Sequence, residues 1–361
     1  MPDDLPNTPD GLPPEADTPE AAEAAAERFR TDFKRLQDEI AKAVVGQRAV
    51  VDGVLTCLFT GGHALLEGVP GIGKTLLVRT LADALSLSFG RVQFTPDLMP
   101  ADITGTTAVY ESDDEQGRRV RTFKFEPGPV FHQIVLADEI NRATPKTQSA
   151  LLEAMQERSV TVAGETHRLP SPFLVMATQN PVEQEGTYPL PEAQLDRFFF
   201  KILVGAPDRE EMGEVLRRTT TGHTADVRPV LDAGAIEAHQ RLIRQVQVAP
   251  SVQDYAVRIV LGTHPKNEGV SGGDGGRWST PMVDKAVRMG ASPRAAQSIL
   301  LASKCRALVD GRAAIATDDV RAAALPALRH RIILNFEGEA EGVTPDQIIS
   351  NLVETMPIDA D

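Results

Sequence analysis

The stretch Gly-Val-Pro-Gly-Ile-Gly-Lys-Thr at residues 68–75 decides the fold of this 361-residue chain. It fits the pattern G-x-x-x-x-G-K-[ST], in which backbone N–H groups of a glycine-rich loop surround a phosphate chain. Lys74 then reaches the β- and γ-phosphates, and the hydroxyl of Thr75 binds Mg²⁺. Residues 63–67 are typical of a short buried strand, and residues 76–82 continue a helix that begins at Lys74. Because a helix N-terminus also attracts anions, this succession predicts a nucleoside triphosphate site and not an ordinary glycine turn.

The composition limits the classes of protein that fit. The chain has 37 Lys and Arg against 51 Asp and Glu, a net charge of −14. This balance argues against duplex nucleic acid as the main partner, because phosphate binding relies on clustered cations. Cys57 and Cys305 have no metal-ligand spacing and fit a reducing compartment. The acidic, Pro-rich start differs from a signal peptide, and no apolar run approaches the ~20 residues of a membrane span, so we expect a soluble, cytoplasmic protein.

Composition also divides the chain into three parts. Residues 1–27 form an acidic, Pro-rich tail that we expect to be disordered, although Thr18-Pro19-Glu20 could cap a helix that starts there. Over residues 28–206, strand-like runs alternate with helical patterns, which predicts an α/β fold with a parallel sheet between helices. Residues 207–361 are expected to form a smaller, all-helical domain with a Gly-rich excursion at 269–276. The candidate strands of the larger domain are residues 63–66, 91–94, 134–137, 173–177 and 198–204.

Two segments interrupt this alternation. Residues 105–126 are expected to form two strands around a polar turn, and residues 159–169 a tighter hairpin about Ala163-Gly164. The first insert carries the basic sequence Arg118-Arg119-Val120-Arg121, followed by Lys124. These cations either bind a polyanion or form a solvated face of the hairpin.

Polar side chains follow two of the apolar strands. Asp138-Glu139 ends the strand at 134–137, and Asn180 follows the strand at 173–177. Because open α/β sheets bind ligands at the carboxyl ends of their strands, we expect all three side chains near the nucleotide. In a phosphohydrolase the first carboxylate holds Mg²⁺ and the second polarises the attacking water. The alternatives are a helix cap for the carboxylates and an Asn-Pro turn for the amide.

These motifs, in this order, resemble the MoxR family of AAA+ ATPases over about residues 40–330. The string Pro-Glu-Ala-Gln-Leu-Asp-Arg-Phe at residues 191–198 is highly specific to this family. The resemblance implies a P-loop NTPase αβα sandwich followed by a helical lid, with the two hairpins as the helix-2 and pre-sensor-1 inserts. The other matching motifs are Val45-Gly46-Gln47, Gly68–Thr75, Asp138–Ala143, Ala177–Pro181 and Gly290–Ala295.

The resemblance also implies residue roles. Asp138 and Glu139 would be the Walker B pair, and Asn180 would be sensor 1. Arg197 would be an arginine finger that acts in trans on a neighbouring subunit, and Arg294 the sensor 2 arginine of the lid. Catalysis would then depend on Glu139, Asn180, Lys74 and, in trans, Arg197. Thr75 and Asp138 would bind the metal. The nucleotide would contact Val45, Gly46, Gly68, Val69, Pro70, Gly71, Ile72, Gly73, Lys74, Thr75, Leu76 and Arg294.

Physical chemistry is compatible with both arginine assignments. An arginine supplied in trans places a planar cation on the charge that develops at the γ-phosphate. Arg294 follows Pro293, which suits the first turn of a lid helix. From the sequence alone, Arg197 could instead form an ion pair with its neighbour Asp196, and Arg294 could be a solvated cation at a helix end.

ATP and Mg²⁺ are therefore the expected cofactors. The resemblance implies a homo-oligomer, a hexameric ring, that acts as a chaperone-like motor on protein clients together with a von Willebrand factor A domain protein. A nucleic-acid motor that uses the basic patch of the first insert is one alternative. A nucleotide-gated scaffold with slow hydrolysis is another, and the presence of Glu139 argues against it.

Overall fold

The computed structural model describes residues 19–69, 71–113, 119–181, 186–221, 225–266 and 276–358. Most of the acidic tail, Pro70, Arg118 and the greater part of the Gly-rich excursion lie outside these residues. Helix α1 (Pro19–Ala41) includes residues 19–27, which the sequence analysis assigned to the tail. No helix among the described residues is long and apolar enough to cross a membrane.

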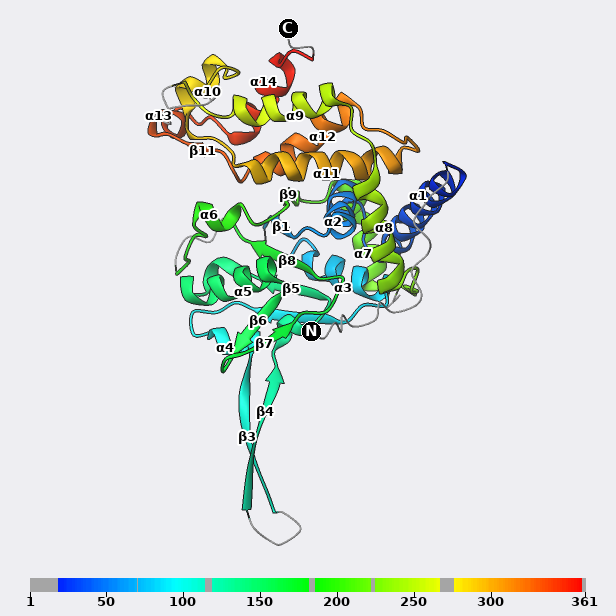
Figure 1. Cartoon of the computed structure of the whole chain (residues 1–361), viewed down its shortest axis with the longest axis vertical. Helices are drawn as coiled ribbons and strands as arrows, with labels where there is room; N and C mark the ends of the chain where they lie inside the picture. Colours follow the sequence, from blue (N-terminus) through cyan, green and yellow to red (C-terminus); the bar gives the residue numbers. More distant parts are fainter. Residues whose placement is uncertain are drawn as a thin grey trace, which may run out of the picture.

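A five-stranded parallel sheet forms the centre of the larger domain (Figure 1). All five strands were predicted, which confirms the α/β fold. Ala64 lies opposite both Met176 and Phe200, so the strands are in register and their carboxyl ends share one edge of the sheet. In spatial order the strands are β2 (Phe89–Gln93), β5 (Ile134–Asp138), β8 (Leu174–Gln179), β1 (Ala64–Glu67) and β9 (Phe200–Leu203).

The sheet is covered on both faces, which explains why its central strands are continuous apolar runs. Consecutive side chains point to opposite faces, and Leu65 and Leu66 accordingly belong to different apolar clusters. Helices α1, α2 (Arg48–Thr60) and α3 (Lys74–Ala84) pack on the Leu66 face. The Leu65 face is covered by α4 (Pro100–Thr104) and α5 (Pro145–Glu157).

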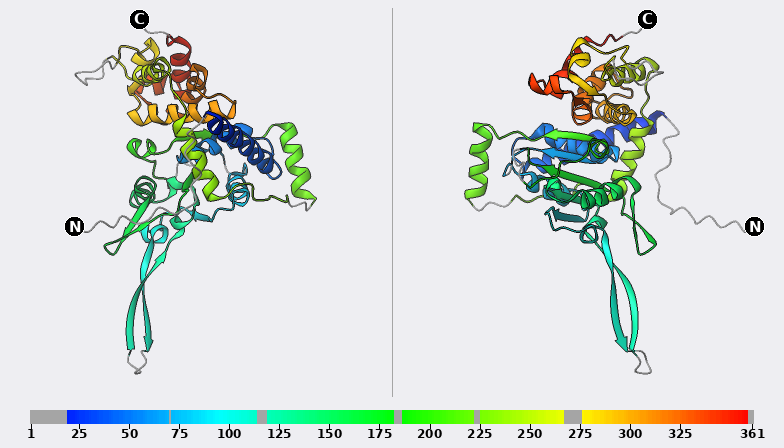
Figure 2. Two further views of the ribbon diagram at one scale, coloured as in Figure 1. Left: turned by 45° about the vertical axis from the view of Figure 1, so that its right-hand side comes forward. Right: turned by 90° about the vertical axis from the view of Figure 1, so that its left-hand side faces the viewer.

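Both predicted hairpins are present. Strands β3 (Gly105–Asp113) and β4 (Arg119–Pro127) form a long antiparallel ribbon that projects away from the sheet domain (Figure 1, Figure 2). Strands β6 (Ser159–Val162) and β7 (Glu165–Arg168) form the shorter one, which turns at Ala163-Gly164 with φ of 51° and 86°. The two inserts touch, because Phe125 of β4 stacks on His167 of β7 with ring centroids 3.9 Å apart.

The C-terminal region is mainly helical, as predicted. After α6 (Glu192–Leu195), α7 (Arg209–Thr220) and α8 (Ala233–Gln245), the remaining elements form a lid above the sheet domain (Figure 1). The lid also contains an antiparallel pair of strands, β10 (Val287–Met289) and β11 (Ile333–Leu334), which is a departure from the all-helical expectation. Segments of three and two residues are too short to give a periodic pattern. The lid helices are α9 (Pro250–Gly262), α10 (Pro281–Ala286), α11 (Pro293–Val309), α12 (Thr317–Leu328), α13 (Phe336–Ala340) and α14 (Pro345–Thr355).

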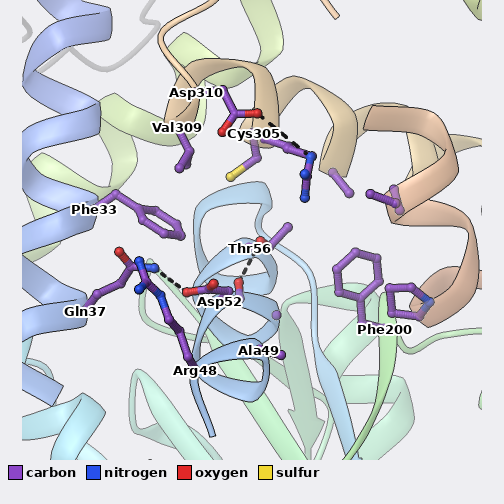
Figure 3. Close-up of a pocket in the computed structure, with 16 residues that line it drawn as sticks. Phe33, Gln37, Arg48, Ala49, Asp52, Thr56, Phe200, Cys305, Val309 and Asp310 are labelled. Carbon is purple, nitrogen blue, oxygen red and sulfur yellow. Dashed lines mark hydrogen bonds and ion pairs between the residues drawn. The ribbon is translucent and has the colours of Figure 1, made fainter. Parts of the chain in front are cut away.

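A cavity of about 480 Å³ lies between α1 and α2 on one side and the lid helices α11 and α12 on the other (Figure 3). Phe33 and Val309 contribute apolar surface to it, and Gln37 donates a hydrogen bond to Asp52 across its floor. Cys305 lines its lid side, and burial raises the pKa of this thiol to about 12. The thiol is therefore protonated at neutral pH and is not a reactive thiolate.

Candidate active site

Two glycines of the phosphate loop have positive φ angles. Gly71 and Gly73 adopt φ of 81° and 86°, and a Cβ at either position would have free space around it. Backbone conformation, not crowding, therefore requires glycine at these two positions. Gly68 differs, because a Cβ there would lie 2.5 Å from the carbonyl oxygen of Val204. The loop can thus turn tightly while its first residue packs directly against the end of β9.

Lys74 begins α3 and lies across the loop, where its Nζ donates to the carbonyl of Gly68 at 2.6 Å. Partial burial lowers the pKa of this ammonium group, whereas the carboxylates of Asp138, Glu139 and Glu67 raise it by attracting the charge. The cation consequently faces the acidic residues of the neighbouring strands. A phosphate chain placed between them would gain its main positive charge from Lys74.

One buried hydroxyl orients both acidic residues. Thr178 on β8 is 1% exposed, and its Oγ1 donates to Asp138 Oδ1 at 2.7 Å. The same oxygen accepts the backbone N–H of Glu139 at 2.8 Å. Glu139 has left-handed backbone angles, φ 57° and ψ 50°, which are unusual for a residue with a side chain. The contact with Thr178 helps to hold this conformation, which turns the chain immediately after β5.

The side chains of the two acids are fixed by further partners. Glu139 Oε2 accepts from Gln93 Nε2 at 2.7 Å and from Arg142 Nη1 at 3.1 Å. Asp138 Oδ2 accepts from Arg91 Nη2 at 2.8 Å. Glu139 makes no side-chain capping bond to the short helix that follows it, so the cap interpretation does not describe its side chain.

These groups line a cavity of about 330 Å³ at the carboxyl edge of the sheet. The Thr75 hydroxyl and the Asp138 carboxylate are oxygen donors of the kind that Mg²⁺ prefers, and Mg²⁺ is usually bound by one or two carboxylates together with substrate phosphates. The residues present therefore fit this metal. The cavity is lined by Gly71, Gly73, Lys74, Thr75, Asp138, Glu139, Thr178 and Asn180.

The predicted adenine-contacting segment lies beside the loop. Gln47 donates from Nε2 to the carbonyl of Ile72 at 2.9 Å, which joins the start of α2 to the phosphate loop. Gly46 has φ of 64°, and a Cβ there would overlap the carboxylate of Glu211 on α7. Val69 on the loop and Leu76 on α3 expose apolar surface nearby. The segment predicted to contact adenine therefore adjoins the phosphate loop.

Arg197 and Arg294 lie at the opposite end of the strands from the phosphate loop. Arg197 precedes β9, so it is found at the amino ends of the strands, and α6 before it lies at the left-hand side of the domain in Figure 1. Arg294, at the start of α11, has Nη1 3.5 Å from Asp196 Oδ2. The four residues of β1 alone separate this edge from the phosphate loop by roughly 13 Å. The structure therefore brings the two arginines together, but not with Lys74.

Asp196 is not paired with Arg197. Its carboxylate accepts from Arg331 Nε at 2.7 Å and from the hydroxyl of Ser292. Within the part of the chain that the structure describes, the Arg197 side chain has no hydrogen bond or ion pair. The local ion pair that the sequence allowed is thus replaced by a contact with the lid.

Comparisons with known proteins agree with this architecture. The family model described as "ATPase family associated with various cellular activities (AAA)" matches residues 63–200, and the model "AAA lid domain" matches residues 280–352. Chaperone MoxR1 of Mycobacterium tuberculosis is 43% identical over 341 residues, which cover 94% of this chain and 85% of that protein. Protein MoxR of Methylorubrum extorquens is 31% identical over 91% of this chain and 96% of its own length. The chain belongs to the MoxR family of AAA+ ATPases.

A solved structure supports the same assignment. The crystal structure of a candidate ATPase from Cytophaga hutchinsonii superposes with a TM-score of 0.84 at 40% identity, and the match covers 94% of this chain and 99% of that one. The α/β sheet domain and the helical lid of this MoxR-family chain therefore agree with the family models and with a solved structure. The family also supports ATPase activity in general terms.

Sequence reasoning missed three residues of the site, namely Arg91, Gln93 and Thr178. Arg91 and Gln93 are alternate, exposed positions of β2, beside the buried Gly90 and Val92. Polar residues at alternate positions near the carboxyl end of a strand were a usable signal, because that edge was already expected to bind the ligand.

Proposed function

We propose that this chain is a Mg²⁺-dependent ATPase that works in the cytoplasm as a hexameric ring, in which each subunit completes the nucleotide site of its neighbour. The proposal is based on the observation that the charged groups of the site lie at opposite ends of the strands. Lys74, Asp138 and Glu139 lie at the carboxyl edge of the sheet, whereas Arg197 and Arg294 lie at its amino edge. A head-to-tail ring brings opposite edges of neighbouring subunits together, and closes when the rotation between subunits allows it.

Each half of this site would have a separate task. Thr75 and Asp138 would hold Mg²⁺, which supplies charge neutralisation at the phosphate oxygens. Lys74 would bind the β- and γ-phosphates, and Glu139 would take a proton from the attacking water. Asn180, in the same cavity, would orient that water or the γ-phosphate. Arg197 and Arg294 of the next subunit would then stabilise the charge on the transferred phosphoryl group.

The projecting β3–β4 ribbon exposes both charged and apolar side chains. Two cations of its basic patch are paired with carboxylates, Arg121 with Glu111 at 2.9 Å and Lys124 with Glu126 at 3.2 Å.

Apolar side chains are exposed on the same ribbon. Val109 and Phe123 lie directly opposite each other on one face and are 53% and 71% exposed. Exposed apolar surface of this kind marks protein contact sites. We therefore propose chaperone-like action on protein clients, together with a von Willebrand factor A domain protein as the family resemblance implies.

A subunit-mixing experiment tests the shared site. Arg197→Ala and Glu139→Gln proteins should each assemble and bind ATP, but each should hydrolyse it at least ~10²-fold more slowly than wild type. In a mixed ring, some interfaces join an intact Glu139 to an intact Arg197 from the other variant, so turnover should partly recover. Absence of recovery in rings shown to contain both variants would reject action in trans.

A further inference from the structure

Asp196 lies between the two arginines of the proposed shared site. It directly precedes Arg197, and its Oδ2 is 3.5 Å from Nη1 of Arg294. Its two carboxylate oxygens also accept from the hydroxyl of Ser292, at 2.9 Å and 2.8 Å. Ser292 caps α11, whose first turn contains Arg294. One carboxylate of the sheet domain therefore contacts both polar residues at the start of this lid helix.

A buried arginine fixes this carboxylate in place. Arg331 follows α12 of the lid, and its side chain is 2% exposed. Its Nε donates to Asp196 Oδ1 at 2.7 Å, while its Nη2 donates to the carbonyl oxygens of Asp196 and Phe198 at 3.1 Å and 2.8 Å. These carbonyls are on either side of Arg197. Because a guanidinium presents its donors in a rigid planar fork, Arg331 determines the backbone path on which Arg197 is placed.

Arg294 is held much less firmly than Arg331. Its side chain is 47% exposed, and 3.5 Å is longer than an ordinary charge-assisted hydrogen bond. Exposed ion pairs of this kind contribute little stability. Arg294 can thus exchange the Asp196 carboxylate for phosphate oxygens, while Arg331 keeps Asp196 in position.

We propose that Asp196 is a positioning residue that assembles Arg197 and Arg294 into one unit for the nucleotide of the neighbouring subunit. Held by Arg331, it fixes the backbone of the first arginine and keeps the second beside it. The inference rests on the proposed function, since it assumes that Arg197 acts in trans. It adds that the sheet domain and the lid must be joined at Asp196 for this action.

The experiment uses mixed rings in which only one kind of interface is active. Donor subunits carry Glu139→Gln and supply the arginines, whereas acceptor subunits carry Arg197→Ala and supply the intact hydrolytic site. Asp196→Asn is then added either to the donor or to the acceptor, and ATP turnover is measured. In the donor it should reduce turnover by about 10- to 10²-fold, as expected when a reacting group is displaced by about 1 Å. In the acceptor it should have little effect, because the acceptor already lacks the finger.

Comparing Asp196→Asn in the donor with Asp196→Asn in the acceptor distinguishes a positioning role from a general loss of folding or assembly. The same substitution is present in both mixtures, so equal losses from the donor and the acceptor would overturn the proposal, as would no loss from either. The matched control is Glu192→Gln in the donor, which removes a pair with Arg288 that also joins α6 to the lid, at 2.7 Å, but is exposed. It should leave turnover unchanged. If the parent mixture fails to recover turnover despite co-assembly, the shared site itself is wrong, and the inference fails with it.

A second variant keeps the test independent of folding defects. Arg294 is half exposed, so Arg294→Gln should not disturb the fold. In the donor it should also reduce turnover, and adding Asp196→Asn should reduce it by less than the product of the two single effects, because both act through one unit. A fully multiplicative effect would show that the two residues act separately and would overturn the proposal.

Discussion

Replacing Thr178 with valine tests whether one hydroxyl orients both acids of the site. Valine keeps the shape of the side chain but removes the bonds to Asp138 and to the N–H of Glu139. A bond to a charged acceptor contributes roughly 1.5–3 kcal/mol and a neutral one about 0.5–1.5 kcal/mol. Because water in the open cavity can replace part of this loss, we expect the free energy of unfolding to fall by about 2 kcal/mol.

The effect of Thr178→Val on turnover should be larger than its effect on stability suggests. The left-handed backbone of Glu139 costs roughly 1–2 kcal/mol, and without Thr178 the residue can relax and move its carboxylate. A displacement of about 1 Å reduces turnover by on the order of 10²-fold. We expect a loss between about 10- and 10²-fold, measured at saturating ATP and Mg²⁺.

Thr60→Val is the matched control for this experiment. Thr60 is also buried, but within the described part of the chain its hydroxyl donates only to carbonyls of its own helix, to Thr56 at 2.7 Å and to Cys57 at 3.2 Å. This variant should keep wild-type turnover, with stability measured by urea unfolding in parallel. Equal turnover in the Thr178→Val and Thr60→Val proteins would refute the orienting role, whatever happens to their stability.

The phosphate loop and two buried histidines can be tested by substitution and by pH. Lys74→Ala should abolish tight ATP binding in calorimetry, because it removes the ammonium group of the phosphate loop; unchanged affinity would contradict the phosphate-loop assignment. Gly73→Ala should lower the free energy of unfolding by about 1–2 kcal/mol through strain at φ 86°, and urea unfolding measures this loss. Burial lowers the pKa of His63 to about 3 and that of His330 well below its usual value. Because an unfolded histidine titrates near 6.5, the unfolded state binds protons below that pH while the buried histidines stay neutral. These residues should therefore leave the free energy of unfolding unchanged above pH 6.5, and each should lower it by about 1.4 kcal/mol per pH unit below that. A flat profile of unfolding free energy between pH 7.5 and 5 would exclude this.

The strands and the phosphate loop could be predicted because their causes are local. An apolar run such as Ile134–Ala137 is buried wherever it pairs, and the loop glycines permit the positive φ that the structure has at Gly71 and Gly73. The position of Asp138 and Glu139 followed from the general rule that ligands bind at the carboxyl ends of parallel strands.

The partners of these residues could not be predicted, because they come from distant parts of the chain. Arg331 is 135 positions beyond Asp196, and the pattern around either residue contains no sign of the other. The same is true of Thr178, which lies 40 positions beyond Asp138 and is brought to it only by the pairing of β5 with β8. An ion pair between the adjacent Asp196 and Arg197 was the alternative that local sequence left open for Arg197, and the structure has Asp196 paired with the lid.

The base of the β3–β4 ribbon has a mechanical consequence. A Cβ at Gly105 would lie 2.3 Å from the carbonyl of Glu126, and one at Gly128 would lie 2.3 Å from that of Ile103. The two ends of the ribbon are thus pressed together backbone against backbone, which leaves little room for bending there. Nine paired residues extend the ribbon by roughly 30 Å. A rotation of the whole ribbon by about 5° about this tightly packed base would therefore move its far end by roughly 3 Å, close to the rise of one strand residue.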